Sequence, residues 1–121
     1  GVVAGQPEEQ QARDMAARTV ELSQFLARHG LRPRPRGQGS VTYHDSCHML
    51  RILGDRESPR AVLSGVEGLE LREMRDTAVC CGFGGTFSVN FPEVSGHLGD
   101  DKARNAAESG ADELVACDLS C

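Results

Sequence analysis

The segment CCGFGG at residues 80–85 restricts local structure more strongly than any other part of this 121-residue chain. Its two cysteines are adjacent and three glycines follow within four residues, so the segment favours a loop. Glycine has no Cβ atom, which lets the backbone turn tightly and direct its N–H groups at a ligand. We therefore predict that the cysteines face a bound group and that the glycines make room for it. The residues of this prediction are Cys80, Cys81, Gly82, Gly84 and Gly85.

Length and composition indicate one domain with a single, mostly aliphatic core. Hydrophobic residues make up 39% of the chain and charged residues 26%, as in ordinary soluble proteins. The net charge of −5 argues against a general electrostatic grip on nucleic acid. No apolar run approaches the roughly 20 residues of a transmembrane helix, and no signal peptide opens the chain. The chain lacks an initiator methionine, so we expect it to be a piece of a longer protein.

The N-terminal third is expected to be a helix followed by a linker. Residues 7–29 carry apolar side chains at helical spacing and are predicted to form one helix that packs against the core. The stripe consists of Met15, Thr19, Leu22, Phe25 and Leu26. Residues 31–40 contain the basic run LRPRPRG and are interpreted as a stiff linker, with a docking patch for an acidic partner as the alternative. This division leaves residues 1–30 as the N-terminal helix and 41–121 as the cysteine-bearing core.

The rest of the chain alternates between strand and helix signals, which predicts an α/β fold. Strands are expected at 41–44, 69–74 and 112–116, and helices after residue 45, at 58–64 and at 92–109. Asp45 or Ser46 is expected to cap the first of these helices, and Ser58 the second. Strands separated by helices pair in parallel, so we predict a small parallel sheet flanked by helices.

The five cysteines are distributed so that this fold would bring them together. Their number is odd and nothing indicates secretion, which favours metal or redox chemistry over a disulfide framework. Cys47 follows the first predicted strand, the adjacent pair lies beyond the second, and Cys117 and Cys121 follow the third. The carboxyl ends of parallel strands meet at one edge of a sheet, where ligands bind. Several thiols at one point indicate an iron–sulfur cluster or zinc.

Simpler interpretations account for single residues but not for the set. A lone buried cysteine is usually a small hydrophobic residue. The glycines do not match a dinucleotide fingerprint, since Phe87 stands where the third glycine belongs, and no phosphate-loop lysine follows. The two C-x-x-C knuckles of a plain zinc site are also missing. His48 beside Cys47 is either a ligand, a proton donor or a hydrogen-bonding loop residue.

Three segments resemble the cysteine-rich CCG domain: HDSCH at 44–48, CCGFGGTFSVNFPEVS at 80–95 and GADELVACDLSC at 110–121. That domain recurs in heterodisulfide reductase, the glycolate oxidase iron–sulfur subunit and lactate utilization protein A. Its pattern is one cysteine, an adjacent pair and a closing Cys-x-x-Cys, and the 32 residues between Cys47 and Cys80 fit it. Asp118 holds the place of the first closing cysteine, with Cys117 one position early, a variant that resembles the lactate utilization A proteins.

The resemblance implies the second CCG domain of a protein whose first CCG domain lies outside this chain. It further implies an iron–sulfur electron-transfer role in a complex that oxidises L-lactate, glycolate or another 2-hydroxy acid, together with partner subunits. Such a complex would be cytoplasmic or held at the membrane surface by its partners. This piece alone is not expected to oxidise the substrate.

The resemblance also implies a ligand set and leaves some roles open. Cys47, Cys80, Cys81 and Cys121 would supply four thiolates, enough for a [4Fe–4S] cluster. Asp118 would be a weak oxygen ligand or a hydrogen-bond partner, and Cys117 a second ligand or, as we favour, a buried residue at a strand end. A purified chain could be empty, because oxygen destroys exposed clusters.

Two alternatives to an electron-transfer domain remain. In the first, the same thiols hold structural zinc in a docking module without a redox role. In the second, the domain is a thiol–disulfide enzyme whose reactive pair is Cys80 and Cys81. The second is disfavoured, because adjacent cysteines form strained disulfides and a C-x-x-C redox motif is missing.

Overall fold

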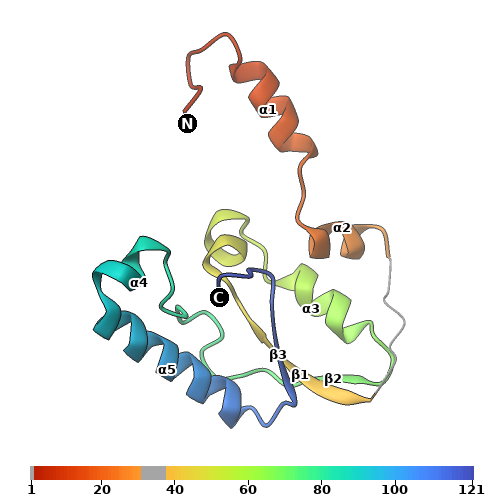
Figure 1. Ribbon diagram of the computed structural model, residues 1–121. Coiled ribbons are helices and arrows are strands. Elements are labelled where there is room, and N and C mark those ends of the chain that lie inside the picture. Colours follow the sequence, from red (N-terminus) through yellow and green to blue (C-terminus); the bar gives the residue numbers. More distant parts are fainter. Residues whose placement is uncertain (1, 31–37) are drawn as a thin grey trace.

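The computed structural model describes residues 2–30 and 38–121 and shows a parallel three-stranded sheet flanked by helices (Figure 1). The strand order is β2-β1-β3, with β1 (Gly39–His44) in the centre, β2 (Leu69–Leu71) on one side and β3 (Glu113–Ala116) on the other. Val41 of β1 is in register with Leu71 of β2 and with Glu113 of β3. The predicted α/β class with a small parallel sheet is therefore confirmed.

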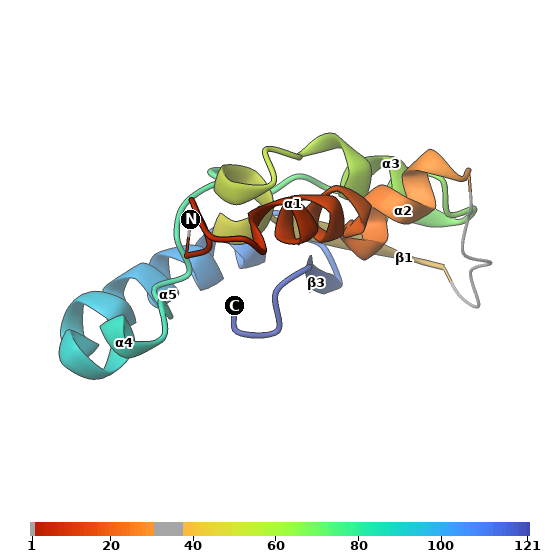
Figure 2. The same ribbon diagram turned by 90° about the horizontal axis from the view of Figure 1, so that it is seen from above.

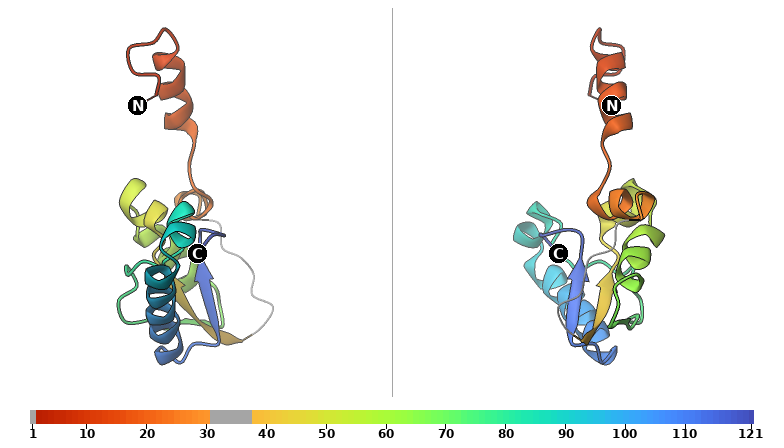
Figure 3. Two further views of the ribbon diagram at one scale, coloured as in Figure 1. Left: turned by 60° about the vertical axis from the view of Figure 1, so that its left-hand side comes forward. Right: turned by 90° about the vertical axis from the view of Figure 1, so that its right-hand side faces the viewer.

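The helices lie on both sides of this sheet. They are α1 (Glu9–Arg18), α2 (Leu22–Arg28), α3 (Glu57–Ser64), α4 (Thr86–Asn90) and α5 (Pro92–Glu108), with a π-helical turn η1 (His48–Ile52). Helices α4 and α5 extend on one side, and α2 and α3 cover the other (Figures 2 and 3). None of the helices in the described ranges is both long and apolar enough to cross a lipid bilayer.

The single helix predicted at 7–29 is wrong, because the chain is extended between α1 and α2. The side chain of Glu21 accepts the backbone N–H groups of Ser23 (2.6 Å) and Gln24 (3.4 Å), and the Gln24 side chain accepts the N–H of Glu21 in return. This capping box starts a new helix at Leu22. Helix α1 has no buried residue and stands away from the sheet (Figure 1), and Met15 is 65% exposed. The apolar stripe of the sequence is thus not core packing over this helix.

Three other predicted boundaries shift. Residues 31–37 of the predicted linker lie outside the described residues, and Gly39 and Ser40 belong to β1. Asp55, rather than Ser58, receives the first backbone N–H groups of α3, those of Glu57 (3.0 Å) and Ser58 (2.9 Å). β2 is shorter than predicted and ends at Leu71.

The core is centred on β1 and contains many polar groups. Its buried apolar side chains in the described chain are Val41, Tyr43, Met49 and Met74. The ring of Tyr43 faces α3, where the Arg60 guanidinium carbon lies 5.2 Å from the ring centroid. His44 is the next residue and points to the opposite face of the sheet. Tyr43 and His44, the last two residues of β1, therefore lie on opposite faces of the sheet at its carboxyl edge.

Candidate metal centre

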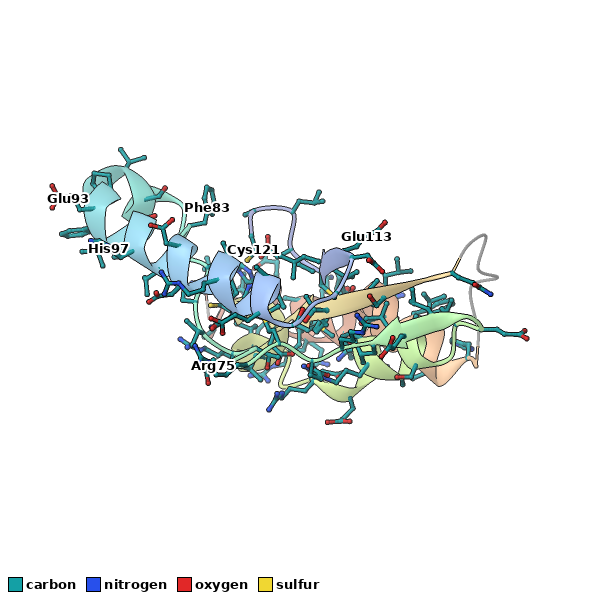
Figure 4. The ribbon with its side chains drawn as sticks, turned by 90° about the horizontal axis from the view of Figure 1, so that it is seen from below. Arg75, Phe83, Glu93, His97, Glu113 and Cys121 are labelled. Atoms are coloured by element: carbon teal, nitrogen blue, oxygen red, sulfur yellow. The ribbon has the colours of Figure 1, made fainter. Side chains whose placement is uncertain are left out.

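One pocket at the carboxyl edge of the sheet collects four of the five cysteines. Its volume is about 350 Å³. The lining residues are Cys47, His48, Cys80, Cys81, Phe83, Gly84, Gly85, Asp118, Ser120 and Cys121. The thiols come from the segments that follow the three strands, as the sequence analysis expected for such an edge. Figure 4 shows Phe83 between α4 and the C-terminal segment that ends at Cys121.

The adjacent cysteines interact with different neighbours. The thiol of Cys80 lies with that of Cys47, and the thiol of Cys81 with that of Cys121. Burial and the neighbouring Cys80 thiol raise the pKa of Cys47, and burial and the Cys81 thiol raise the pKa of Cys121 to about 12. A cation among the sulfurs would reverse these shifts, since thiolate is the form that binds metal. The arrangement therefore suits a positively charged centre.

Gly82 is required by close packing of the cysteine loop on α5. Its φ is +90°, and a Cβ atom there would lie 2.3 Å from the carbonyl oxygen of Ser95. The Ser95 hydroxyl donates a hydrogen bond to the Gly82 carbonyl (2.8 Å), and the Gly82 N–H donates to the Cys80 Sγ (3.3 Å). Gly82 thus fixes the loop and supplies an N–H to a sulfur, whereas Gly84 and Gly85 line the pocket itself.

Asp118 and His48 form a polar pair at the pocket rim. The Asp118 Oδ2 lies 2.7 Å from the His48 Nδ1, and its Oδ1 accepts the Ser120 N–H at 2.9 Å. The Ser120 N–H, with His48, lowers the pKa of Asp118. Asp118 is therefore held at the rim by hydrogen bonds with His48 and Ser120.

Cys117 does not line this pocket. Its Sγ lies 3.0 Å from the hydroxyl oxygen of Tyr43, on the side of the sheet that α2 and α3 cover. The expectation that it is a buried strand-end residue is wrong in one respect, because the residue is exposed. It follows β3 directly, where alternation turns its side chain away from the other thiols.

Buried charges hold the segments that carry the cysteines, and the sequence analysis did not find them. Asp45 was expected to be a helix cap, but its fully buried carboxylate accepts hydrogen bonds from Arg60 (2.8 and 3.1 Å) and Thr77 (2.7 Å). Ser46 is the residue that accepts the N–H of Met49, at 3.3 Å. Asp45 therefore ties the start of the Cys47 segment to α3 and to the loop before Cys80.

Lys102 of α5 supports the same loop from the other side. The residue is 4% exposed, and its Nζ donates to the carbonyl oxygens of Asp76 and Thr77, both at 3.0 Å. Burial lowers the pKa of Lys102. The sequence signal was its position four residues after Leu98 and three before Asn105, on the inner face of the helix.

His44 is a candidate ligand that sequence reasoning missed. It is 2% exposed, and neither ring nitrogen has a hydrogen-bond partner among the described residues. One ring nitrogen, the Cys81 Sγ and the Cys121 Sγ all lie within 4.8 Å of one another. Burial lowers the pKa of His44, with the Lys102 charge adding to the effect. Its place at the end of a predicted strand was the available signal.

Thiols and an imidazole form a soft donor set of the kind that holds iron–sulfur clusters or zinc. The pocket volume of about 350 Å³ is more than one metal ion needs. The orphaned imidazole nitrogens also indicate that the site is built around a bound group. The residues present therefore fit either kind of centre.

Comparison with known proteins finds relatives over nearly the whole chain. The chain is similar to lactate utilization protein A from Halalkalibacterium halodurans, with 44% identity over 116 residues that cover 93% of this chain and 47% of the relative. The protein of that name from Geobacillus thermodenitrificans is 44% identical over 124 residues, covering 99% of this chain and 52% of the relative. The chain thus spans about half the length of these curated relatives.

No solved structure matches the chain. Residues 41–121 match the family described as the cysteine-rich domain CCG. That range contains the whole sheet except the first two residues of β1, and it includes all four pocket cysteines. The expected resemblance is confirmed, and the chain belongs to the family of cysteine-rich CCG domains.

Proposed function

We propose that this domain holds an iron–sulfur cluster and transfers electrons in the oxidation of L-lactate or a related 2-hydroxy acid. The observation that carries the proposal is the convergence of four thiols, from the segments after three strands, on one pocket. The similarity to lactate utilization protein A supports the substrate class.

The chain's own residues would have three tasks. Cys47, Cys80, Cys81 and Cys121 would hold the cluster, which when bound accepts and donates single electrons. The Gly82 N–H would stabilise negative charge on the Cys80 sulfur, which favours the reduced state of the centre. Asp45 would keep the two cysteine-bearing segments together, as its hydrogen bonds to Arg60 and Thr77 indicate.

The hydroxy-acid chemistry would lie elsewhere in the assembly. The chain spans about half of its relatives' length, so we propose that another CCG domain and partner subunits complete the electron path. Oxidation of a 2-hydroxy acid to the 2-oxo acid releases two electrons and two protons. A cluster passes electrons singly, so two such transfers would be needed for each substrate.

A zinc-binding structural module is the second candidate, and one observation favours it. The donor atoms of His44, Cys81 and Cys121 lie within 4.8 Å of one another, close enough to share one tetrahedral ion. In that case the metal would stabilise the fold without a redox role.

Anaerobic reconstitution with iron and sulfide distinguishes these functions. The cluster proposal predicts about four irons and four sulfides per chain, visible absorption, and an EPR signal after dithionite reduction. Cys81→Ser should abolish the signal. Cys117→Ser is the matched control, because its thiol lies outside the pocket, and it should load like the wild type.

Zinc bound at one ion per chain, with no iron or sulfide retained, would overturn the cluster proposal and support the structural module. Equal loading of Cys81→Ser and the wild type would show that the cluster binds elsewhere. An electron-transfer role also requires that the reduced cluster be reoxidised reversibly in a redox titration.

A further inference from the structure

We propose that His44 is a ligand of the metal centre, bound through an imidazole nitrogen beside Cys81 and Cys121. The inference rests on the proposed function in one respect, since it requires a metal bound to the pocket cysteines. His44 does not line the pocket itself, but one of its ring nitrogens lies within 4.8 Å of the Cys81 and Cys121 sulfurs. It assigns a nitrogen ligand to a site that the sequence presents as all-cysteine, and it applies to a cluster and to a single ion alike.

The first argument is that His44 is buried without a partner. It is only 2% exposed, and neither ring nitrogen makes a hydrogen bond of normal geometry within residues 2–30 and 38–121. The Thr77 carbonyl oxygen is a nearby acceptor, but it already receives the Lys102 Nζ at 3.0 Å and the Asp45 N–H at 3.2 Å. A buried polar group left unpaired is costly, so native proteins rarely retain one. A coordinate bond to a metal would satisfy one ring nitrogen and would offset the cost of burying this histidine in the core.

The second argument is distance. A ring nitrogen of His44 and the sulfurs of Cys81 and Cys121 are mutually within 4.8 Å. With Zn–S bonds of about 2.3 Å and Zn–N bonds of about 2.0 Å, ligand atoms of a tetrahedral ion lie roughly 3.5–3.8 Å apart. The three atoms are therefore near the separation that one metal imposes, and small side-chain rotations would complete it.

The third argument is topology, because the three donors come from three different strand ends. His44 ends β1, Cys81 lies in the loop beyond β2, and Cys121 follows β3. The adjacent cysteines therefore have different neighbours. The Cys80 thiol is next to the Cys47 thiol, and the Cys81 thiol is next to the His44 imidazole. In a multinuclear centre, His44 would bind the metal atom on the Cys81 side.

His48, which the sequence analysis named as a possible ligand, lacks these properties. Its side chain is 72% exposed and its Nδ1 lies 2.7 Å from an oxygen of Asp118. It therefore has a partner and faces solvent at the rim. This difference makes His48→Ala the matched control for every measurement on His44.

The test is pulsed EPR on the reduced, reconstituted 121-residue chain, with and without ¹⁵N-labelled histidine. A directly bound imidazole gives a strong nitrogen hyperfine coupling that changes when the histidines carry ¹⁵N. We expect that coupling in the wild type and in His48→Ala, and its loss in His44→Leu. The labelled wild type needs no substitution, so the result does not depend on the folding of a core variant.

A second readout uses Co²⁺ alone, without iron or sulfide. X-ray absorption should show one nitrogen among sulfur ligands in the wild type and in His48→Ala.

A third readout is the reduction potential of the reconstituted iron–sulfur cluster. His44→Cys should lower this potential, because a charged thiolate replaces a neutral imidazole.

The outcomes separate this inference from the proposed function. A loaded cluster without imidazole coupling overturns the His44 ligand and leaves the electron-transfer proposal standing. A chain that takes Co²⁺ with one nitrogen ligand but assembles no cluster supports His44 and overturns the electron-transfer proposal. Coupling that disappears in His48→Ala but persists in His44→Leu assigns the nitrogen ligand to His48 at the rim and overturns the inference. A chain that binds no metal also overturns it.

Discussion

At the scale of single residues, buried polar contacts position the cysteines. The backbone beside Cys47 is held by Asp45, and the loop before Cys80 by Lys102. Burial by itself raises the pKa of Asp45, but hydrogen bonds from Arg60 and Thr77 outweigh it and hold the pKa below its ordinary value. The carboxylate is therefore charged, paired and inaccessible to water.

Asp45→Asn should be strongly destabilising. It leaves the Arg60 guanidinium without its buried partner, which typically costs about 3–5 kcal/mol. Urea unfolding at neutral pH measures the difference. Glu73→Gln is the matched control, because Glu73 contacts the same guanidinium from a 43% exposed position and should cost less than about 1 kcal/mol. Similar losses in both variants would contradict the central role of Asp45.

At the scale of elements, short helices depend on caps that connect them to their neighbours. Asp55 accepts the first N–H groups of α3, and one of its carboxylate oxygens also receives the Gln24 side chain of α2 at 2.9 Å. The Asp55 carboxylate thus caps α3 and connects it to α2, which precedes it in the chain. The same dependence on caps divides the N-terminal region, where Glu21 begins α2.

Asp55→Ala should lower the free energy of unfolding by about 1–2 kcal/mol at pH 7. Partial burial raises the pKa of Asp55, but hydrogen bonds from Ser58 and Gln24 outweigh it and hold the pKa below 3.8. The stabilisation is therefore complete above about pH 5 and is lost as the pH falls through the folded-state value. Urea unfolding at several pH values should show the wild type approaching the variant in acid.

The control for this experiment is Glu57→Ala, which removes an acidic group from the same helical turn without removing a cap. It should cost only about 0.3–1 kcal/mol, the usual effect of a charge near a helix end. A difference between wild type and Asp55→Ala that stays constant down to about pH 2 would contradict the assignment.

At the scale of the whole molecule, the apolar core is small for the number of residues it organises. Few apolar side chains are fully buried in the described chain, and a group of thiols lies at the sheet edge. A metal that links the ends of three strands would add cross-links where apolar packing is sparse. Metal binding should therefore contribute to folding stability.

Reconstitution should raise the midpoint of thermal unfolding by roughly 10 °C when free metal exceeds its dissociation constant about a hundredfold. Anaerobic circular dichroism measures the midpoint, and a chelator should reverse the shift. Cys121→Ser should show little increase, whereas Cys117→Ser should match the wild type. An unchanged midpoint on loading would mean that the metal binds folded and unfolded chains equally.

The α/β class and the gathering of thiols at one edge could be predicted from the sequence, because strand and helix periodicities are local and parallel strands align their carboxyl ends. Which side chains meet there depends on contacts between residues far apart in the chain, which no local pattern encodes. His44 lies three residues before Cys47, and Cys117 directly precedes Asp118. Strand alternation turns His44 toward Cys81 and Cys121 and turns Cys117 to the other side of the sheet. Likewise, the local sequence around Asp45 predicts a helix cap, whereas its partner in the structure is Arg60, fifteen residues further along the chain.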